Sequence, residues 1–226
     1  MKELRYTLLS DGSSDRALLP IITWLLREHR VDCAIQSTWA DLRRLPKPPK
    51  TLPLRIISSL ELYPCDLLFV HRDAEREPRE NRVAEIREAI TLAVESVPVP
   101  PTVCVVPVRM QEAWLLFEEA ALRRAAGNPR GKQPLQLPVS DKVEQLPDPK
   151  NILHELLRSA SGLTGRRLKD FSVRECAGRV AELIDDFTPL RCLEAFRALE
   201  EDVKQIIQAQ GWCSSPDGKP SSLRLE

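Results

Sequence analysis

Ionisable side chains crowd the end of one apolar segment near residue 70. Residues 67–70 are four large apolar side chains in a row, which is typical of a parallel strand buried on both faces. Four ionisable residues lie directly behind this run: His71, Arg72, Asp73 and Glu75. The carboxyl end of such a strand is where open α/β sheets bind their ligands.

The spacing of Asp73 and Glu75 is the chemical feature of this stretch. The two residues are two positions apart, so along an extended chain their carboxylates would point the same way. Neighbouring carboxylates repel each other unless a proton or a divalent cation lies between them. We therefore predict half of a metal site here. The competing interpretation is a strand that runs into a solvated charged loop, and an isolated Asp-x-Glu pattern favours it.

Asp11 occupies the matching position after an earlier predicted strand, residues 4–9. If the two strands are parallel, Asp11, Asp73 and Glu75 open onto the same edge of the sheet. Three carboxylates without clustered thiols or imidazoles indicate a hard cation, Mg²⁺ or Mn²⁺, rather than zinc. The alternative is a plain turn at residues 11–15 that caps the following helix.

Four side chains are secondary candidates for the same site. Asp15 is either a further acid or a partner of the helix dipole. His71 and Arg72 are neighbours on a strand, so only one of them is expected to face the site. Glu112 follows the fourth predicted strand and either adds a carboxylate or interacts with a helix N-terminus.

Candidates for binding substrate phosphates are basic and lie in the second half of the chain. They are Lys150, Arg166, Arg167 and Lys169. Short basic clusters are more often solvated surface than a phosphate-binding track. Aromatic residues make up 5% of the chain, which gives no stacking platform of the kind that single-strand binders use, and Trp114 is expected in the core.

Hydrophobic periodicity predicts an α/β fold with a parallel four-stranded sheet flanked by helices, followed by a helical C-terminal extension. Strands that alternate with helices imply right-handed crossovers and a parallel sheet. Pro20 should kink the first helix or mark a late start. The predicted strands are residues 4–9, 31–39, 66–70 and 102–108, and the predicted helices between or behind them are residues 15–29, 52–62 and 79–96, with further helices at 152–158, 172–187 and 190–208.

These patterns divide the chain into four parts. Residues 1–126 form the α/β domain, and residues 127–149 are a proline-containing linker or irregular crossover. Residues 150–210 form a helical subdomain, and residues 211–226 a flexible tail. The apolar stripes of residues 150–208 either complete one core or offer a docking face to a second copy or to an ATPase partner.

Composition limits the class of protein. The chain has 226 residues, with 33 Lys plus Arg and 33 Asp plus Glu, so phosphate binding would require a local patch rather than a global field. No secretory signal and no apolar run of transmembrane length is present in the sequence, which predicts a cytoplasmic protein that does not enter membranes. The six cysteines are scattered and are expected to be free thiols. Because there is no Walker-type loop, any ATPase would be a partner chain.

Two motifs resemble the Toprim pattern. They are Leu-Leu-Ser-Asp-Gly-Ser-Ser-Asp at residues 8–15 and Leu-Phe-Val-His-Arg-Asp-Ala-Glu at residues 68–75. The Toprim family of topoisomerases, bacterial primases, OLD-type nucleases and small nuclease relatives shows a strand ending in acid-Gly and a later strand ending in an Asp-x-Asp-like pair. This resemblance covers residues 4–108. Residues 112–116, 148–150 and the helix around Phe196 are similar to a small Toprim-like family associated with bacterial defence systems.

The resemblance implies roles for three residues. Asp11 would be the general acid/base or first metal ligand, and Asp73 and Glu75 would hold Mg²⁺, which polarises the scissile phosphate and activates a water molecule. The family usually has Glu at the first position and Asp at the last, so this chain departs from the pattern at both.

The resulting functional prediction has two forms. The first is a Mg²⁺-dependent phosphodiester hydrolase, a nuclease that acts on DNA or RNA, with a role in bacterial anti-phage defence. The alternative is a non-catalytic Toprim module that binds nucleic acid or a partner ATPase. Neutral net charge favours the second, and the clustering of acids at strand ends favours the first.

Overall fold

The structure is a computed structural model that describes residues 3–212. Four parallel strands form one sheet in the order β2-β1-β3-β4, so the predicted α/β architecture is confirmed. In chain order the strands are β1 (Glu3–Leu9), β2 (Ala34–Trp39), β3 (Leu67–His71) and β4 (Thr102–Val105). The two central strands, β1 and β3, pair Leu9 with Val70 at their carboxyl ends, which brings the residues behind them to the same edge.

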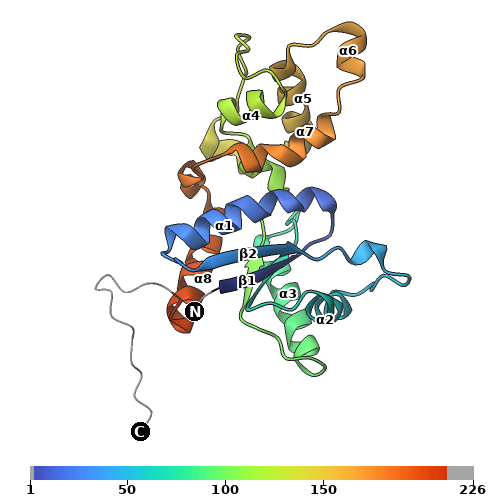
Figure 1. The fold of residues 1–226 in the computed structure, drawn as a ribbon, viewed down its shortest axis with the longest axis vertical. Helices are drawn as coiled ribbons and strands as arrows, with labels where there is room; N and C mark the ends of the chain where they lie inside the picture. Colours follow the sequence, from blue (N-terminus) through green and yellow to red (C-terminus); the bar gives the residue numbers. More distant parts are fainter. Residues whose placement is uncertain (1–2, 213–226) are drawn as a thin grey trace.

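Helices cover both faces of the sheet (Figure 1). Leu67 and Phe69 pack with α1 (Leu18–Glu28) and α8 (Glu194–Gln210) in one apolar cluster. Leu68 and Val70 pack with helices α2 and α3 in a second cluster. Successive side chains of a strand point to opposite faces, which explains why β3 is apolar without alternation. The bounds of the second pair are Leu52–Leu62 for α2 and Arg79–Val94 for α3.

The first helix starts late, as Pro20 predicts. Ser13–Ala17 form a 3₁₀ turn, η1, and the α-helix begins only at Leu18. Pro20 therefore lies in the first turn of α1, where a backbone N–H has no intrahelical partner to lose.

A second group of helices lies beyond the sheet (Figure 1). Helices α4, α5 and α7 contact one another, and α6 lies between α5 and α7 in the chain. Residues 126–148 are irregular apart from a 3₁₀ turn at Ser140–Gln145. In contrast, α8 lies against β4 and α1, so the apolar stripe of this last helix completes the core of the sheet. The bounds are α4 (Glu119–Ala125), α5 (Pro149–Ser161), α6 (Gly165–Lys169) and α7 (Val173–Val180).

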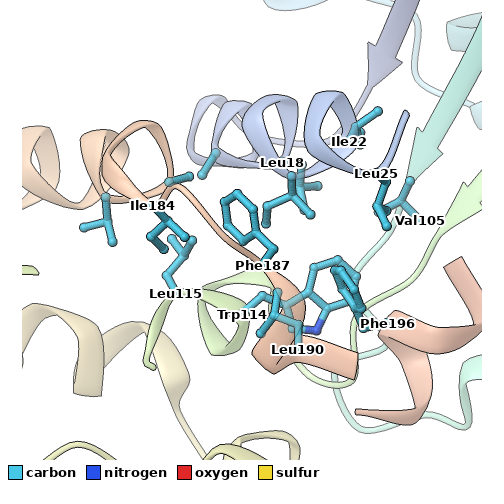
Figure 2. Close-up of a cluster of buried hydrophobic side chains, with 14 of the residues drawn as sticks. Leu18, Ile22, Leu25, Val105, Trp114, Leu115, Ile184, Phe187, Leu190 and Phe196 are labelled. Carbon is cyan, nitrogen blue, oxygen red and sulfur yellow. The ribbon is translucent and has the colours of Figure 1, made fainter. Parts of the chain in front are cut away.

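Trp114 joins the sheet to α8. Its side chain is fully buried and meets the ring of Phe196 edge-on, with the ring centroids 5.4 Å apart. Figure 2 shows both rings beside residues of α1, with Phe187 and Leu190 closing the cluster. The core role predicted for Trp114 is confirmed.

Other features bear on the predicted partners and thiols. Among residues 3–212, no helix combines the length and the hydropathy needed to cross a membrane. The five cysteines in this part of the chain are free thiols, and Cys213 lies outside it, as does most of the predicted tail at 211–226. The large apolar side chains that stand exposed are Leu54, Leu62, Leu92, Val94 and Val139. Within the described residues, none falls in 150–208, so the predicted docking face gains no support there.

Candidate functional site at the carboxyl edge of the sheet

Asp11 lies at the predicted edge and is held there by two arginines. Its Oδ1 contacts Nη1 of Arg55 on α2, and its Oδ2 lies 3.1 Å from Nε of Arg72. Arg72 in turn lies 3.1 Å from Glu85 of α3. The carboxylate of Asp11 is therefore drawn toward the α2 and α3 side of the sheet and is neutralised by two guanidinium groups.

Asp15, His71 and Asp73 form a separate cluster on the α1 side. Nδ1 of His71 lies 3.5 Å from Oδ2 of Asp15, and Nε2 lies 3.2 Å from Oδ1 of Asp73. Both contacts are close ion pairs rather than well-aligned hydrogen bonds. The His71 side chain is 1% exposed and that of Asp15 is 8% exposed. As predicted, His71 and Arg72 face opposite sides.

The charges of this cluster shift two pKa values. Burial lowers the pKa of His71, but the two carboxylates outweigh it and raise the pKa to about 9. Burial raises the pKa of Asp15, but His71 and the Gly12 N–H lower it below its ordinary value. The Gly12 N–H donates to Oδ2 of Asp15 at 2.8 Å, so Asp15 both caps the helix start and faces the imidazole. At neutral pH the cluster is a buried imidazolium between two carboxylates.

Gln111 closes the cluster and was not predicted. Its backbone N–H donates to Oδ1 of Asp73 at 3.0 Å, and its Nε2 lies 3.5 Å from Oδ1 of Asp15. Gln111 follows β4 in the chain, so its position behind a parallel strand was the available signal. Arg55 was missed as well, because an arginine within an amphipathic helix carries no signal for pairing with a distant turn.

The predicted parallel direction of the Asp73 and Glu75 carboxylates is wrong. Glu75 has a φ of 55°, in the left-handed region, and its N–H donates to the carbonyl of Arg109 at 3.1 Å. The backbone is therefore not extended at this point, and the strand alternation that would align the two side chains is lost. The Glu75 side chain is 68% exposed and lies 3.9 Å from Arg82.

The three predicted metal ligands share an edge but do not meet. Asp11 pairs with arginines, Asp73 with His71, and Glu75 with Arg82. Within residues 3–212, no three His, Cys, Asp or Glu side chains are grouped so that they could hold a metal ion. The carboxylates supply the oxygen ligands that Mg²⁺ or Mn²⁺ prefers, but in this arrangement they do not fit one ion. The predicted convergence of Asp11, Asp73 and Glu75 is therefore corrected.

A cleft of about 700 Å³ opens beside this edge, between the sheet and the helices α5 and α7. The wall nearest the sheet carries Gln111 and Glu112 and the serines at the start of η1. The opposite wall carries Lys150, His154 and Arg174. Asp15 and Asp73, with His71 between them, lie directly behind Gln111, so with Glu112 the wall nearest the sheet is net negative. On the opposite wall the cations Lys150 and Arg174 outnumber the one carboxylate, Asp148.

Glu112 and Lys150 connect the two walls. Nζ of Lys150 lies 3.3 Å from Oε1 of Glu112, whose side chain is 7% exposed. Burial raises the pKa of Glu112, the charge of Asp73 adds to the rise, and Lys150 opposes it. On the basic wall, burial lowers the pKa of His154, and the charges of Arg158, Lys150 and Arg174 lower it further. His154 is therefore neutral at pH 7 in a surrounding dominated by cations.

The remaining basic candidates lie elsewhere. Arg166, Arg167 and Lys169 are exposed side chains of α6, and Arg166 lies 3.9 Å from Asp170 of the same helix. None of the three is among the described residues that line the cleft. Of the four predicted phosphate contacts, the structure brings only Lys150 to the site.

The position of Lys150 depends on a helix cap that can be tested. Asp148 precedes α5, and its Oδ1 accepts the N–H of Asn151 at 3.0 Å. We expect Asp148→Ala to lower the free energy of unfolding by about 1 kcal/mol, because an N-cap acceptor is lost. Urea unfolding would measure this loss. Asp148→Asn is the matched control, since Asn caps equally well, and a similar loss in both variants would contradict the capping role.

Comparisons of this chain with protein-family models, with curated proteins and with solved structures find no match.

Proposed function

We propose that the protein is a phosphodiester hydrolase that acts on DNA or RNA, with the cleft between the sheet edge and the α5 and α7 helices as its active site. The observation that carries this proposal is the polarity of the cleft. The wall with Glu112 and Gln111, behind which Asp15 and Asp73 lie, is opposite the wall that carries Lys150 and Arg174.

The basic wall would bind the substrate phosphate. Lys150 and Arg174 line the cleft, and both ammonium and guanidinium groups bind phosphate oxygens. Burial, and after it the charges of Arg158, Lys150 and Arg174, lower the pKa of His154, and Asp148 opposes them. A neutral imidazole can also donate one hydrogen bond to a phosphate oxygen. A net neutral protein would thus bind nucleic acid through one local patch.

A carboxylate of the acidic wall would accept the proton of the attacking water. A general base works best when its pKa lies close to the working pH, and burial moves the pKa of Glu112 in that direction. Glu112 reaches the cleft while its Oε1 lies near Nζ of Lys150. A water molecule between Glu112 and a phosphate bound by Lys150 could give its proton to Glu112 as it attacks the phosphorus.

Dependence on Mg²⁺ or Mn²⁺ is what the resemblance to Toprim proteins implies. The donors Asp11, Asp73 and Glu75 do not fit one ion in the present arrangement, so the roles given above to Glu112, Lys150 and Arg174 are those of the chain's own side chains. A divalent ion would supply Lewis-acid polarisation of the phosphate.

A second candidate function is a non-catalytic module that binds nucleic acid or a partner ATPase. The observation in its favour is that the acids at the strand ends already have partners within the chain. Asp11 is paired with Arg55 and Arg72, and Asp15 and Asp73 share His71. A site whose carboxylates are neutralised in this way can support binding without chemistry.

Incubation with end-labelled nucleic acids separates the two functions. We expect the purified protein to cut single-stranded DNA, duplex DNA or single-stranded RNA, and Lys150→Met to lower the rate at least about tenfold through loss of phosphate binding. The assay is run with Mg²⁺, with Mn²⁺ and with EDTA, so that the ion dependence is read directly. Arg166→Met on α6, outside the cleft, is the matched control.

Each outcome decides between the candidates. Cutting that Lys150→Met reduces and Arg166→Met leaves intact supports the hydrolase. Equal cutting by the wild type and Lys150→Met assigns the activity to a contaminant or to another site. Binding without cutting, measured by fluorescence anisotropy of the same oligonucleotides, favours the module. If the protein neither binds nor cuts these oligonucleotides, both candidate functions are overturned.

A further inference from the structure

A smaller hollow opens at the same sheet edge, beside Asp11. It has a volume of about 180 Å³ and is lined by the ends of β1 and β2, by the loop that joins β2 to α2, and by α2 itself. We call it the proline-loop pocket; its lining includes Asp11, Trp39, Arg43, Pro49, Lys50 and Arg55. Pockets for drug-sized ligands usually measure about 300–1,000 Å³, so this one suits a smaller group, such as a single phosphate.

The segment that forms this pocket, the loop after β2 together with α2, is basic. Between Asp41 and Glu61 the chain has five basic residues and no acidic one, although the protein as a whole is neutral. The loop projects from the body of the molecule between β2 and α2 (Figure 1). Three of the five basic residues, Arg43, Lys50 and Arg55, line the pocket. Asp11 is the one carboxylate among the lining residues, so the pocket is net positive and complementary to an anion.

Trp39 gives the pocket a fixed wall. Its Nε1–H donates to Oγ of Ser10 at 2.8 Å. The guanidinium carbon of Arg43 lies 4.9 Å from the centre of the ring, and that of Arg16 lies 5.8 Å from it. Cation–π contacts of this kind hold a guanidinium group in place, so Arg43 is positioned before any ligand binds.

The three basic side chains differ in how far they are already neutralised. Arg43 lies 3.0 Å from Asp41, and Arg55 contacts Asp11. Lys50 is exposed and has no ion-pair partner among residues 3–212. An incoming anion would therefore interact most strongly with Lys50.

One turn borders both the cleft and the proline-loop pocket. Ser10 and Asp11 line the proline-loop pocket, and Ser13 and Ser14, a few residues further on, line the cleft. A chain of phosphates that crosses this turn would therefore meet Lys150 and Arg174 on one side and Lys50 and Arg43 on the other.

On the basis of the nucleic-acid function proposed above, we propose that the proline-loop pocket is a second phosphate subsite, which binds a backbone phosphate of the strand that also enters the cleft. Lys50 and Arg43 hold the phosphate, and Trp39 holds Arg43. The ligand is the phosphodiester backbone itself, which DNA and RNA share.

The test is the salt dependence of binding to fluorescein-labelled single-stranded DNA and RNA of equal length. Removing one phosphate contact lowers the slope of log K against log salt by about 0.7–0.9 and weakens binding by about five- to tenfold near 0.1 M salt. We expect both effects in Lys50→Gln and in Arg43→Gln. The matched control is Arg44→Gln: Arg44 belongs to the same loop and pairs with the same Asp41, but it does not line the pocket.

The outcomes distinguish this subsite from the proposed function. Weaker binding and a smaller slope in Lys50→Gln, with Arg44→Gln close to the wild type, support the subsite. Equal affinities and slopes for Lys50→Gln, Arg44→Gln and the wild type overturn it, while Lys150→Met, if it still weakens binding, leaves the cleft proposal standing. A wild type that binds neither labelled strand overturns both.

Discussion

Replacing His71 with glutamine is expected to lower the free energy of unfolding by about 3–5 kcal/mol, the range for removing one partner of a buried ion pair. The imidazole is 1% exposed and lies between the carboxylates of Asp15 and Asp73. A neutral glutamine would leave two negative charges close together, one of them buried. Because Asp15 also caps the start of the first helix, part of the loss would come from disorder at residues 12–17.

The pKa shifts of His71 and Asp15 predict how stability varies with pH. The pKa of His71 is raised to about 9 from an ordinary 6.5, so its contribution is complete below pH 6.5 and is lost as the pH rises to about 9. The pKa of Asp15 is lowered, so its contribution is complete above its ordinary value and is lost as the pH falls below it. Wild-type stability should therefore decline between pH 6.5 and 9, and in His71→Gln this decline should be absent.

Urea unfolding at intervals between pH 5 and 9 would measure both effects. His29→Gln is the control, because His29 also lies beside a carboxylate, at 3.2 Å from Glu200, but is 21% exposed. A pair with that exposure contributes at most about 1 kcal/mol. If His71→Gln matches His29→Gln in stability and keeps the wild-type decline with pH, the imidazole does not act as a cation between the two carboxylates.

The sequence was sufficient for those features that a local pattern determines. An uninterrupted apolar run predicted that β3 is buried on both faces, and the alternation of strands and helices predicted a parallel sheet. Together they placed Asp11 and Asp73 at one edge. The apolar stripe of α8 was also read from the sequence, but its partner was not. Periodicity shows that a helix has an apolar face, without showing which surface covers that face.

The features that could not be predicted depend on backbone geometry and long-range contacts. The left-handed conformation of Glu75 turns its carboxylate away from Asp73. Glutamate seldom adopts this conformation, so its presence in the sequence does not predict such a turn. The neutralisation of Asp11 requires Arg55, 44 positions away. The cleft requires α5 and α7 to lie beside the sheet edge, and the irregular residues 126–148 that place them carry no periodic signal.

In the proposed active site, replacing Glu112 with glutamine is expected to lower kcat for phosphodiester cleavage by about 10²–10⁴, the usual contribution of a general base. Glutamine has the size of glutamate and can still hydrogen-bond, so the fold and the binding of the substrate should be retained. The measurement is the single-turnover rate with a labelled oligonucleotide, together with its Kd by fluorescence anisotropy. Glu175→Gln is the matched control, because Glu175 is exposed on α7 and does not line the cleft.

The pH profile separates a general base from a merely structural acid. A base acts in its charged form, so the rate should rise as the pH passes the pKa of Glu112, which burial has raised. Lys150 lowers that pKa. Lys150→Met should therefore move the rising limb of the plot of rate against pH to higher pH, besides weakening substrate binding. An acid that serves only to fix Lys150 would leave the limb where it is in the wild type. An unshifted limb in Lys150→Met, or an unchanged kcat in Glu112→Gln, would remove Glu112 from the chemistry and would leave the cleft with a binding role alone.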